Sequence, residues 1–125
     1  MSEQADRLKV RVGDFAVAVL NFVRRLPPDI ATDSVVRQVA RSAASVGSNY
    51  RAACYARSRA EFIAKLGTAV DEADETEHWL WMAGQLGLAS GRQFDALVNE
   101  SRELRSILAA SIGTARRNAA KNTVK

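Results

Sequence analysis

The sequence has little of what usually holds a small domain together, because it contains one cysteine, Cys54, and one histidine, His78. One cysteine cannot form an intramolecular disulfide, and one cysteine with one histidine cannot supply the four ligands of a structural zinc site. Glu75 and His78 have the Glu-x-x-His spacing of di-iron bundles, but such a site needs a second pair. We therefore expect no metal and no cofactor, so that hydrophobic packing must hold the fold.

Long apolar segments are also absent. The longest uncharged run near the N-terminus covers residues 15–23, about half of the roughly 20 residues that a membrane-spanning helix needs. The first residues are acidic and polar, whereas a signal peptide begins with a basic region followed by an apolar run. We expect a cytoplasmic protein without a membrane partner.

A recognisable catalytic set is missing as well. A nucleophilic Cys54 would need a neighbouring base, yet it shares an apolar helix face with Tyr50. At 100° per residue, His78 projects roughly 160° away from the apolar stripe of its helix, where it is expected to be a surface residue. The sequence contains no phosphate-binding loop of the G-x-x-x-x-G-K type. We expect no enzyme and no catalytic residues.

Prolines are few, and both stand at one place in a chain of 125 residues, the size of one domain. The pattern predicts a first helix over residues 2–26, because apolar residues repeat at spacings of four and three until Pro27 and Pro28 end it. The repeating positions are Leu8, Val12, Phe15, Val19, Phe22 and Leu26.

The next two helices are predicted from their end signals. The second should run to residue 55 from a side-chain cap at one of three positions: Thr32, Asp33 or Ser34. Gly47 lies in its middle, where close packing of another backbone is the ordinary compensation for a glycine. Ser58 and Glu61 form a capping box that starts a third helix over residues 59–86, and Gly87 ends it.

A fourth helix is predicted over residues 91–117, because Ser90 and Gln93 repeat the capping-box signature. Residues 118–125 form a polar, basic tail that we expect to fray. Four amphipathic helices joined by short turns predict an all-α fold, an antiparallel up-down-up-down four-helix bundle in which residues 1–125 form a single domain.

Charge is unevenly distributed along the chain, whose net charge is +4. Residues 1–57 carry nine Lys/Arg against five Asp/Glu, residues 58–87 carry two against six, and residues 88–125 carry seven against three. One acidic segment therefore lies between two basic ones. Either helices of opposite sign attract one another within a bundle or between copies, or the basic segments form a surface for nucleic acid.

Two polar ladders lie beside the apolar stripes of the second and third helices. The first consists of Arg41, Ser45 and Asn49, which recur every fourth residue. The second consists of Lys65, Thr68, Glu72, Glu75 and Trp79, at alternating spacings of three and four. If the two helices are antiparallel neighbours, Asn49 should lie level with Lys65, and Arg41 should lie near Glu72 or Glu75.

These ladders have two interpretations. They either form an ion-pair network that holds the helices together, or they form a binding site for a phosphate backbone or a partner. In the second case the contacts would come from Arg41, Ser45, Asn49, Arg51 and Lys65, with Glu72 and Glu75 orienting them. Arg116 and Arg117, together with Lys121 and Lys125, form a basic C-terminal run that either remains solvated or binds RNA.

Residues 41–80 resemble a four-helix-bundle family that includes the proteins encoded in intervening sequences of bacterial 23S ribosomal RNA genes. The family pattern R-S/A-x-x-S-x-x-x-N matches at Arg41, Ser45 and Asn49, F-I-x-K-L matches at residues 62–66, and E-A-x-E-T-x-x-W-L matches at residues 72–80. One departure is that Ala52 and Ala53 stand near the place where the family often has Glu-Gly.

The resemblance implies an antiparallel bundle without catalysis that assembles into a ring, a homopentamer in relatives. A related class of bundles serves as nucleic-acid-binding accessories to the reverse transcriptases of diversity-generating retroelements. We therefore expect a non-enzymatic, ring-forming bundle that binds RNA or another nucleic acid through basic residues of the second and fourth helices. Its partners would be copies of itself and RNA or a nucleic-acid enzyme. The alternative is an oligomeric scaffold or adaptor that does not bind nucleic acid.

Overall fold

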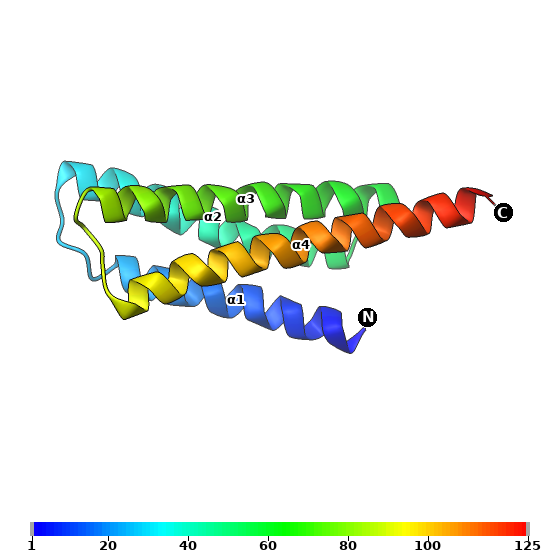
Figure 1. Cartoon of the computed structure of the whole chain (residues 1–125), viewed down its shortest axis with the longest axis horizontal. Coiled ribbons are helices and arrows are strands. Elements are labelled where there is room, and N and C mark those ends of the chain that lie inside the picture. The colour runs from blue at the N-terminus through cyan, green and yellow to red at the C-terminus, as the bar shows by residue number, and fades with distance from the viewer. Residues whose placement is uncertain (1, 125) are drawn as a thin grey trace.

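The computed structural model describes residues 2–124, with side chains described up to residue 121, and contains four helices. They are α1 (Glu3–Val23), α2 (Ile30–Cys54), α3 (Arg59–Gln85) and α4 (Arg92–Val124). Each helix runs opposite to the helix before it (Figure 1), and the described residues form no strand. The predicted all-α four-helix bundle is confirmed.

The link between α1 and α2 differs from the prediction in where the helices end and begin. α1 ends at Val23, three residues earlier than predicted, and α2 begins at Ile30 rather than after Thr32. Asp29 is the N-cap, because its extended backbone directly follows the two prolines and its side chain accepts a 2.8 Å hydrogen bond from the Thr32 amide. This bond lowers the pKa of Asp29.

α3 has the ends that its sequence predicts. Ser58 Oγ accepts a 3.1 Å hydrogen bond from the Glu61 amide at the start of the helix. At the other end Gly87 has φ +72°, and the Leu88 amide donates to the Ala83 carbonyl at 2.9 Å, as in a Schellman motif.

α4 differs from the prediction at both of its ends. It begins at Arg92, and the Asp95 amide donates to the Gly91 carbonyl at 2.9 Å. Gly91 therefore occupies the N-cap position, which the predicted capping box of Ser90 and Gln93 had assigned to Ser90. The helix continues to Val124 instead of ending at Arg117. The reason is local, since residues 118–124 contain neither glycine nor proline, and cations in a last turn complement the negative end of the helix dipole. Lys125 lies outside the described residues.

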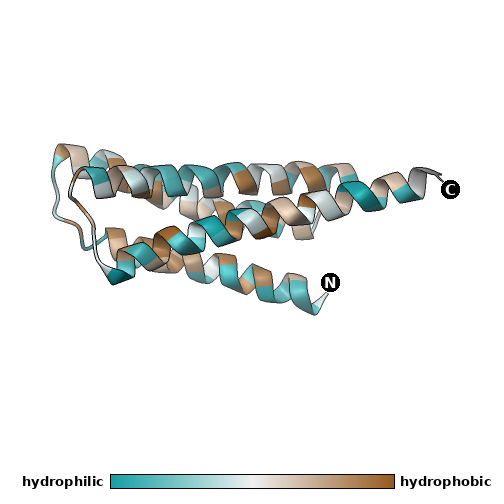
Figure 2. Ribbon diagram, viewed as in Figure 1, coloured by the Kyte–Doolittle hydropathy of each residue, from teal (hydrophilic) through white to brown (hydrophobic). Residues whose placement is uncertain are grey.

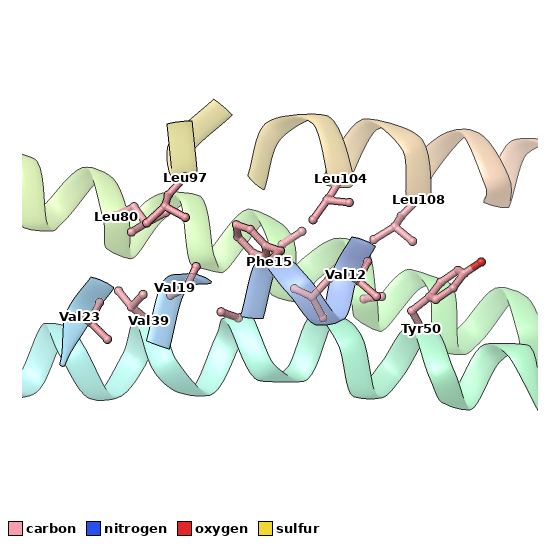
Figure 3. Close-up of a cluster of buried hydrophobic side chains, with 14 of the residues drawn as sticks. Val12, Phe15, Val19, Val23, Val39, Tyr50, Leu80, Leu97, Leu104 and Leu108 are labelled. Atoms are coloured by element: carbon pink, nitrogen blue, oxygen red, sulfur yellow. The ribbon is translucent and has the colours of Figure 1, made fainter. Parts of the chain in front are cut away.

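Each helix is amphipathic, and hydrophilic and hydrophobic residues alternate turn by turn along the ribbons (Figure 2). The apolar sides meet in one core, in which α1 contributes Val12, Phe15 and Val19 and α4 contributes Leu104 and Leu108 (Figure 3). The interface between α2 and α3 is built from small buried residues such as alanine, which lets the two backbones approach closely.

Gly47 of α2 faces α1 in this core. A methyl group added to it would lie 3.8 Å from the Val12 carbonyl oxygen, which is ordinary van der Waals contact. The predicted close approach is therefore present, although the space would also accept alanine.

The bundle is not equally tight on all sides. α1 and α4 make the fewest contacts of the neighbouring helices, and they diverge toward the end where both chain termini lie (Figure 1). The last turns of α4 project beyond the other three helices at that end. In the part of the chain that the structure describes, no helix is long and apolar enough to span a membrane.

Candidate functional site

The two polar ladders meet along the α2–α3 interface. Arg41 Nη1 lies 3.2 Å from Glu72 Oε2, and its Nη2 donates to Glu75 Oε1. Trp79 Nε1 donates to the same Glu75 oxygen at 3.3 Å. These donors, the Arg41 guanidinium first, lower the pKa of Glu75. The predicted proximity of Arg41 to Glu72 and Glu75 is confirmed.

A buried pair of hydroxyl groups lies next to this cluster. Thr76 Oγ1 lies 2.8 Å from Ser42 Oγ and 2.8 Å from the Glu72 carbonyl oxygen. Both residues are fully buried, so the bonds satisfy polar groups that water cannot reach. The arrangement fixes the register of α2 against α3.

The other end of the ladders is arranged differently. Asn49 Nδ2 donates to the Ser45 carbonyl oxygen at 2.9 Å, within α2 itself. Lys65 is exposed, and no hydrogen bond or salt bridge joins it to another described residue. The structure therefore brings Arg41, Glu72 and Glu75 together and leaves Lys65 outside that network.

Other arginines in the middle of the bundle are paired in the same way. Arg11 of α1 binds Glu100 of α4 through two hydrogen bonds of 2.8 and 2.7 Å, which raise the pKa of Arg11. From α4, Arg102 and Arg105 contact acidic residues of α3, at distances between 2.6 and 3.3 Å. The acidic third helix is thus neutralised by its neighbours, as one of the two charge hypotheses expects.

Most of the remaining basic residues gather at one end of the molecule. We call this the basic end and define it as residues 2–9, 50–65 and 110–121, which lie at the end that holds both chain termini (Figure 1). It contains nine Lys/Arg against three Asp/Glu, whereas residues 10–49 and 66–109 contain eight against eleven. The positive net charge of the chain is therefore concentrated at the basic end.

The predicted residues Arg51, Lys65, Arg116 and Arg117 all belong to the basic end and are exposed. Arg117 donates to the Thr114 hydroxyl oxygen at 3.2 Å. None of the four has a carboxylate of another described residue within salt-bridge distance. They are available for an anionic ligand.

Sequence reasoning missed Lys9 and Arg57 as members of this cluster. Lys9 and Arg51 lie 5.1 and 6.0 Å from the ring centroid of the exposed Tyr55, so that two cations contact one aromatic ring. Arg57, in the turn after α2, and Lys121, in α4, are exposed in the same basic end. Counting charge by the ends of an antiparallel bundle, rather than along the chain, would have found them.

Of the two residues that the sequence analysis excluded from catalysis, His78 lies outside the basic end and Cys54 lies within it. His78 is exposed and stacks against Trp81 with a centroid distance of 6.2 Å. Cys54 is half-buried. No three metal-ligating side chains gather in the part of the chain that the structure describes.

The chain is similar to a known protein family and to solved structures. The family described as 23S rRNA-intervening sequence protein matches residues 10–110. A crystal structure of a protein with unknown function, from the S23 ribosomal protein family of Bacteroides thetaiotaomicron VPI-5482, is similar with 33% identity and a TM-score of 0.80. The similarity covers 87% of this chain and 97% of that one.

Among curated proteins, none matches the chain. The family match includes all three segments on which the resemblance was recognised, from Arg41 to Leu80, as well as most of α1 and α4. The chain therefore belongs to the family of 23S rRNA-intervening sequence proteins.

Proposed function

We propose that this protein is a non-enzymatic, cytoplasmic, RNA-binding bundle whose basic end contacts the phosphate backbone. The observation that carries the proposal is the separation of charge between the two parts of the molecule. In the middle of the bundle the arginines are paired with carboxylates, as Arg41 and Arg11 show. At the basic end, cations outnumber carboxylates by nine to three.

An excess of cations without carboxylate partners is what a phosphate backbone requires. Each Lys or Arg that neutralises a phosphate releases condensed counterions, and this release supplies most of the non-specific affinity. Arg116 and Arg117 are exposed on α4, the helix whose last turns project from the bundle (Figure 1). Arg51 lies on the α2 side of the same end.

The polar ladders enter this proposal in two roles. Arg41, Glu72 and Glu75 hold α2 against α3, because both carboxylates already contact the guanidinium. Ser45 and Asn49 are joined to each other within α2. Only Lys65, Arg51, Arg116 and Arg117 of the predicted set remain as phosphate contacts.

A matched pair of variants on one helix tests the proposal. Arg51→Gln removes a cation of the basic end, whereas Arg37→Gln removes an exposed cation of α2 outside it. Affinity for a mixed single-stranded RNA should fall in Arg51→Gln and remain unchanged in Arg37→Gln. Affinity that barely changes with salt in the unmodified protein would contradict the proposal, because phosphate contacts are salt-dependent.

A second proposal concerns assembly, and an exposed apolar stripe on α1 supports it. Val10, Val17 and Leu20 are 63%, 59% and 39% exposed, and their spacings of seven and three place them on one side of the helix. α1 thus carries one apolar stripe in the core and another on its outer side. A contiguous exposed apolar patch is typical of an interaction surface.

A groove continues this stripe toward α4. It has a volume of about 720 Å³, and the residues that line it include Val10, Phe15, Ala18 and Leu97. A helix of a second copy would bury both the stripe and the groove, and we therefore propose that copies associate through α1. The family resemblance implies a homopentameric ring, and this number is part of the proposal.

Sedimentation equilibrium tests the assembly. Val17→Glu places a charge in the centre of the stripe and should give a monomer, since a buried charge without a partner is unfavourable. Ala44→Glu adds the same charge at an exposed position of α2 and should leave the assembly intact. An assembly that survives Val17→Glu would show that α1 is not the contact.

The scaffold alternative keeps the assembly and omits RNA. It would be favoured by an intact oligomer that shows no affinity for RNA at low salt. In that case the basic end would contact an acidic protein partner instead.

A further inference from the structure

A pocket opens within the basic end, where α1 and α4 diverge. Its volume is about 770 Å³, within the range of roughly 300–1,000 Å³ that is usual for small-molecule sites. It lies between the start of α1, the turn that leads into α3 and residues 107–118 of α4. The pocket is therefore separate from the polar cluster at Arg41 and from the groove beside Val10.

The lining of the pocket combines an apolar floor with polar groups. Leu8, Phe62 and Ile107 supply apolar surface from three different helices. Ser111 and Asn118 of α4 supply hydroxyl and amide groups. This combination suits a flat, apolar ring that carries hydrogen-bonding groups on its edge.

Tyr50 closes the inner end of the pocket. It lies at the end of the core beside Leu108 (Figure 3), and its hydroxyl group is 3.4 Å from the Ala5 carbonyl oxygen. Burial raises the pKa of Tyr50. Because the hydroxyl group donates its one hydrogen to the Ala5 carbonyl oxygen, its own oxygen remains as an acceptor for a ligand.

Two cations lie at this pocket. Arg59, at the start of α3, belongs to its lining, and Arg117 of α4 donates to the hydroxyl oxygen of Thr114, which also belongs to it. An anionic ligand is thus favoured over a cationic one. The ligand that combines a flat polar ring with negative charge on both sides is a nucleotide within a chain.

We infer that the pocket receives one unpaired nucleobase of a single-stranded RNA, while the neighbouring phosphates contact the basic end. This inference rests on the proposed RNA binding and adds the class of RNA. In a duplex the bases are paired and stacked, and moving one of them into a pocket requires breaking those contacts. The pocket therefore gives a preference for single strands over duplexes.

The size of the preference follows from base stacking. Contact of one base with an aromatic side chain such as Phe62 changes affinity by about tenfold. The charge contacts, in contrast, are made with either form of RNA. We expect the protein to bind a single strand about tenfold more tightly than a duplex of the same length at the same salt concentration.

Filling the pocket tests the inference. Ala110 lines the pocket and is exposed, whereas the neighbouring Ala109 is exposed outside it. Ala110→Phe should lower the affinity for single-stranded RNA about tenfold, to the value for the duplex, and leave the duplex affinity unchanged. Ala109→Phe adds the same side chain to the same helix and should change neither affinity, with fluorescence anisotropy as the measurement.

The outcomes separate this inference from the proposed function. If replacing both Arg116 and Arg117 by Gln weakens RNA binding while Ala110→Phe has no effect, the pocket inference is wrong and the proposed function remains. If the protein binds neither form of RNA at low salt, the proposed function fails.

Crosslinking gives a second readout that needs no variant and so does not depend on the folding of Ala110→Phe. A single strand containing 4-thiouridine, irradiated in complex with the unmodified protein, should attach to Tyr50 or Phe62. Attachment only to the exposed Trp81, which lies outside the basic end, would overturn the inference.

Discussion

The salt dependence of RNA binding measures directly how many cations of the basic end contact phosphates. We consider the double substitution Arg116→Gln and Arg117→Gln, which removes two positive charges from exposed positions of α4 within the basic end. Glutamine is a good helix former, so the substitution changes charge without interrupting the helix. Stability to heat should therefore remain close to that of the unmodified protein.

The magnitude can be worked out from the structure. Seven cations of the basic end have no carboxylate of another described residue within salt-bridge distance: Lys9, Arg51, Arg57, Lys65, Arg116, Arg117 and Lys121. For a single strand, each phosphate contact contributes about −0.7 to the slope of the logarithm of affinity against the logarithm of salt concentration. The steepest slope is then about −5, and loss of two contacts makes it shallower by about 1.4.

The measurement is a titration of labelled single-stranded RNA by fluorescence anisotropy, between about 50 and 200 mM salt. The control is the substitution of Arg24 and Arg25 by Gln, which removes two adjacent arginines near the end of α1, outside the basic end. Its slope should equal that of the unmodified protein. Equal slopes for the two double variants would refute the reasoning, because net charge alone would then determine binding.

The other predictions concern stability. Arg41→Ala should lower the free energy of unfolding at pH 7, because Glu75 loses the cation that lowers its pKa in the folded state. This loss should vanish as the pH falls below the unfolded-state pKa of Glu75 and through its lowered folded-state pKa, since a protonated Glu75 no longer needs the cation. Chemical denaturation at several pH values measures the free energy of unfolding. In the same assay, Gly67→Ala should raise the free energy of unfolding by about 1 kcal/mol, because no other atom lies within 4 Å of the added methyl group. Gly87→Ala should lower it by about 1 kcal/mol, because φ is +72° there. Leu104→Ala should lower it by about 2–5 kcal/mol through the cavity left in the core, and a loss below 1 kcal/mol would contradict the packing described here.

The helix ends show which signals can be read from a sequence. Ser58 and Gly87 bound α3 as predicted, because each acts through hydrogen bonds to residues within a few positions of it. Asp29 was missed although it is a good capping residue, since Thr32, Asp33 and Ser34 offer equivalent side chains and only the path of the chain after the prolines decides among them.

The candidate site divides in the same way. The contact of Arg41 with Glu72 and Glu75 could be predicted, because a short turn between two antiparallel helices determines which residues lie level with each other. The basic end could not be predicted from spacing. Lys9 and Arg51 come from two helices and meet at Tyr55 only when the bundle closes.

The sequence by itself determined the four helices, their order, the apolar side of each and the family to which the chain belongs, because these depend on spacing within one helix or across one turn. The tertiary structure decided where the charge is concentrated, how far α1 and α4 diverge, and that a pocket opens beside Phe62 between them. These properties depend on distances between residues that are far apart in the chain, and only the packing of complete helices sets such distances.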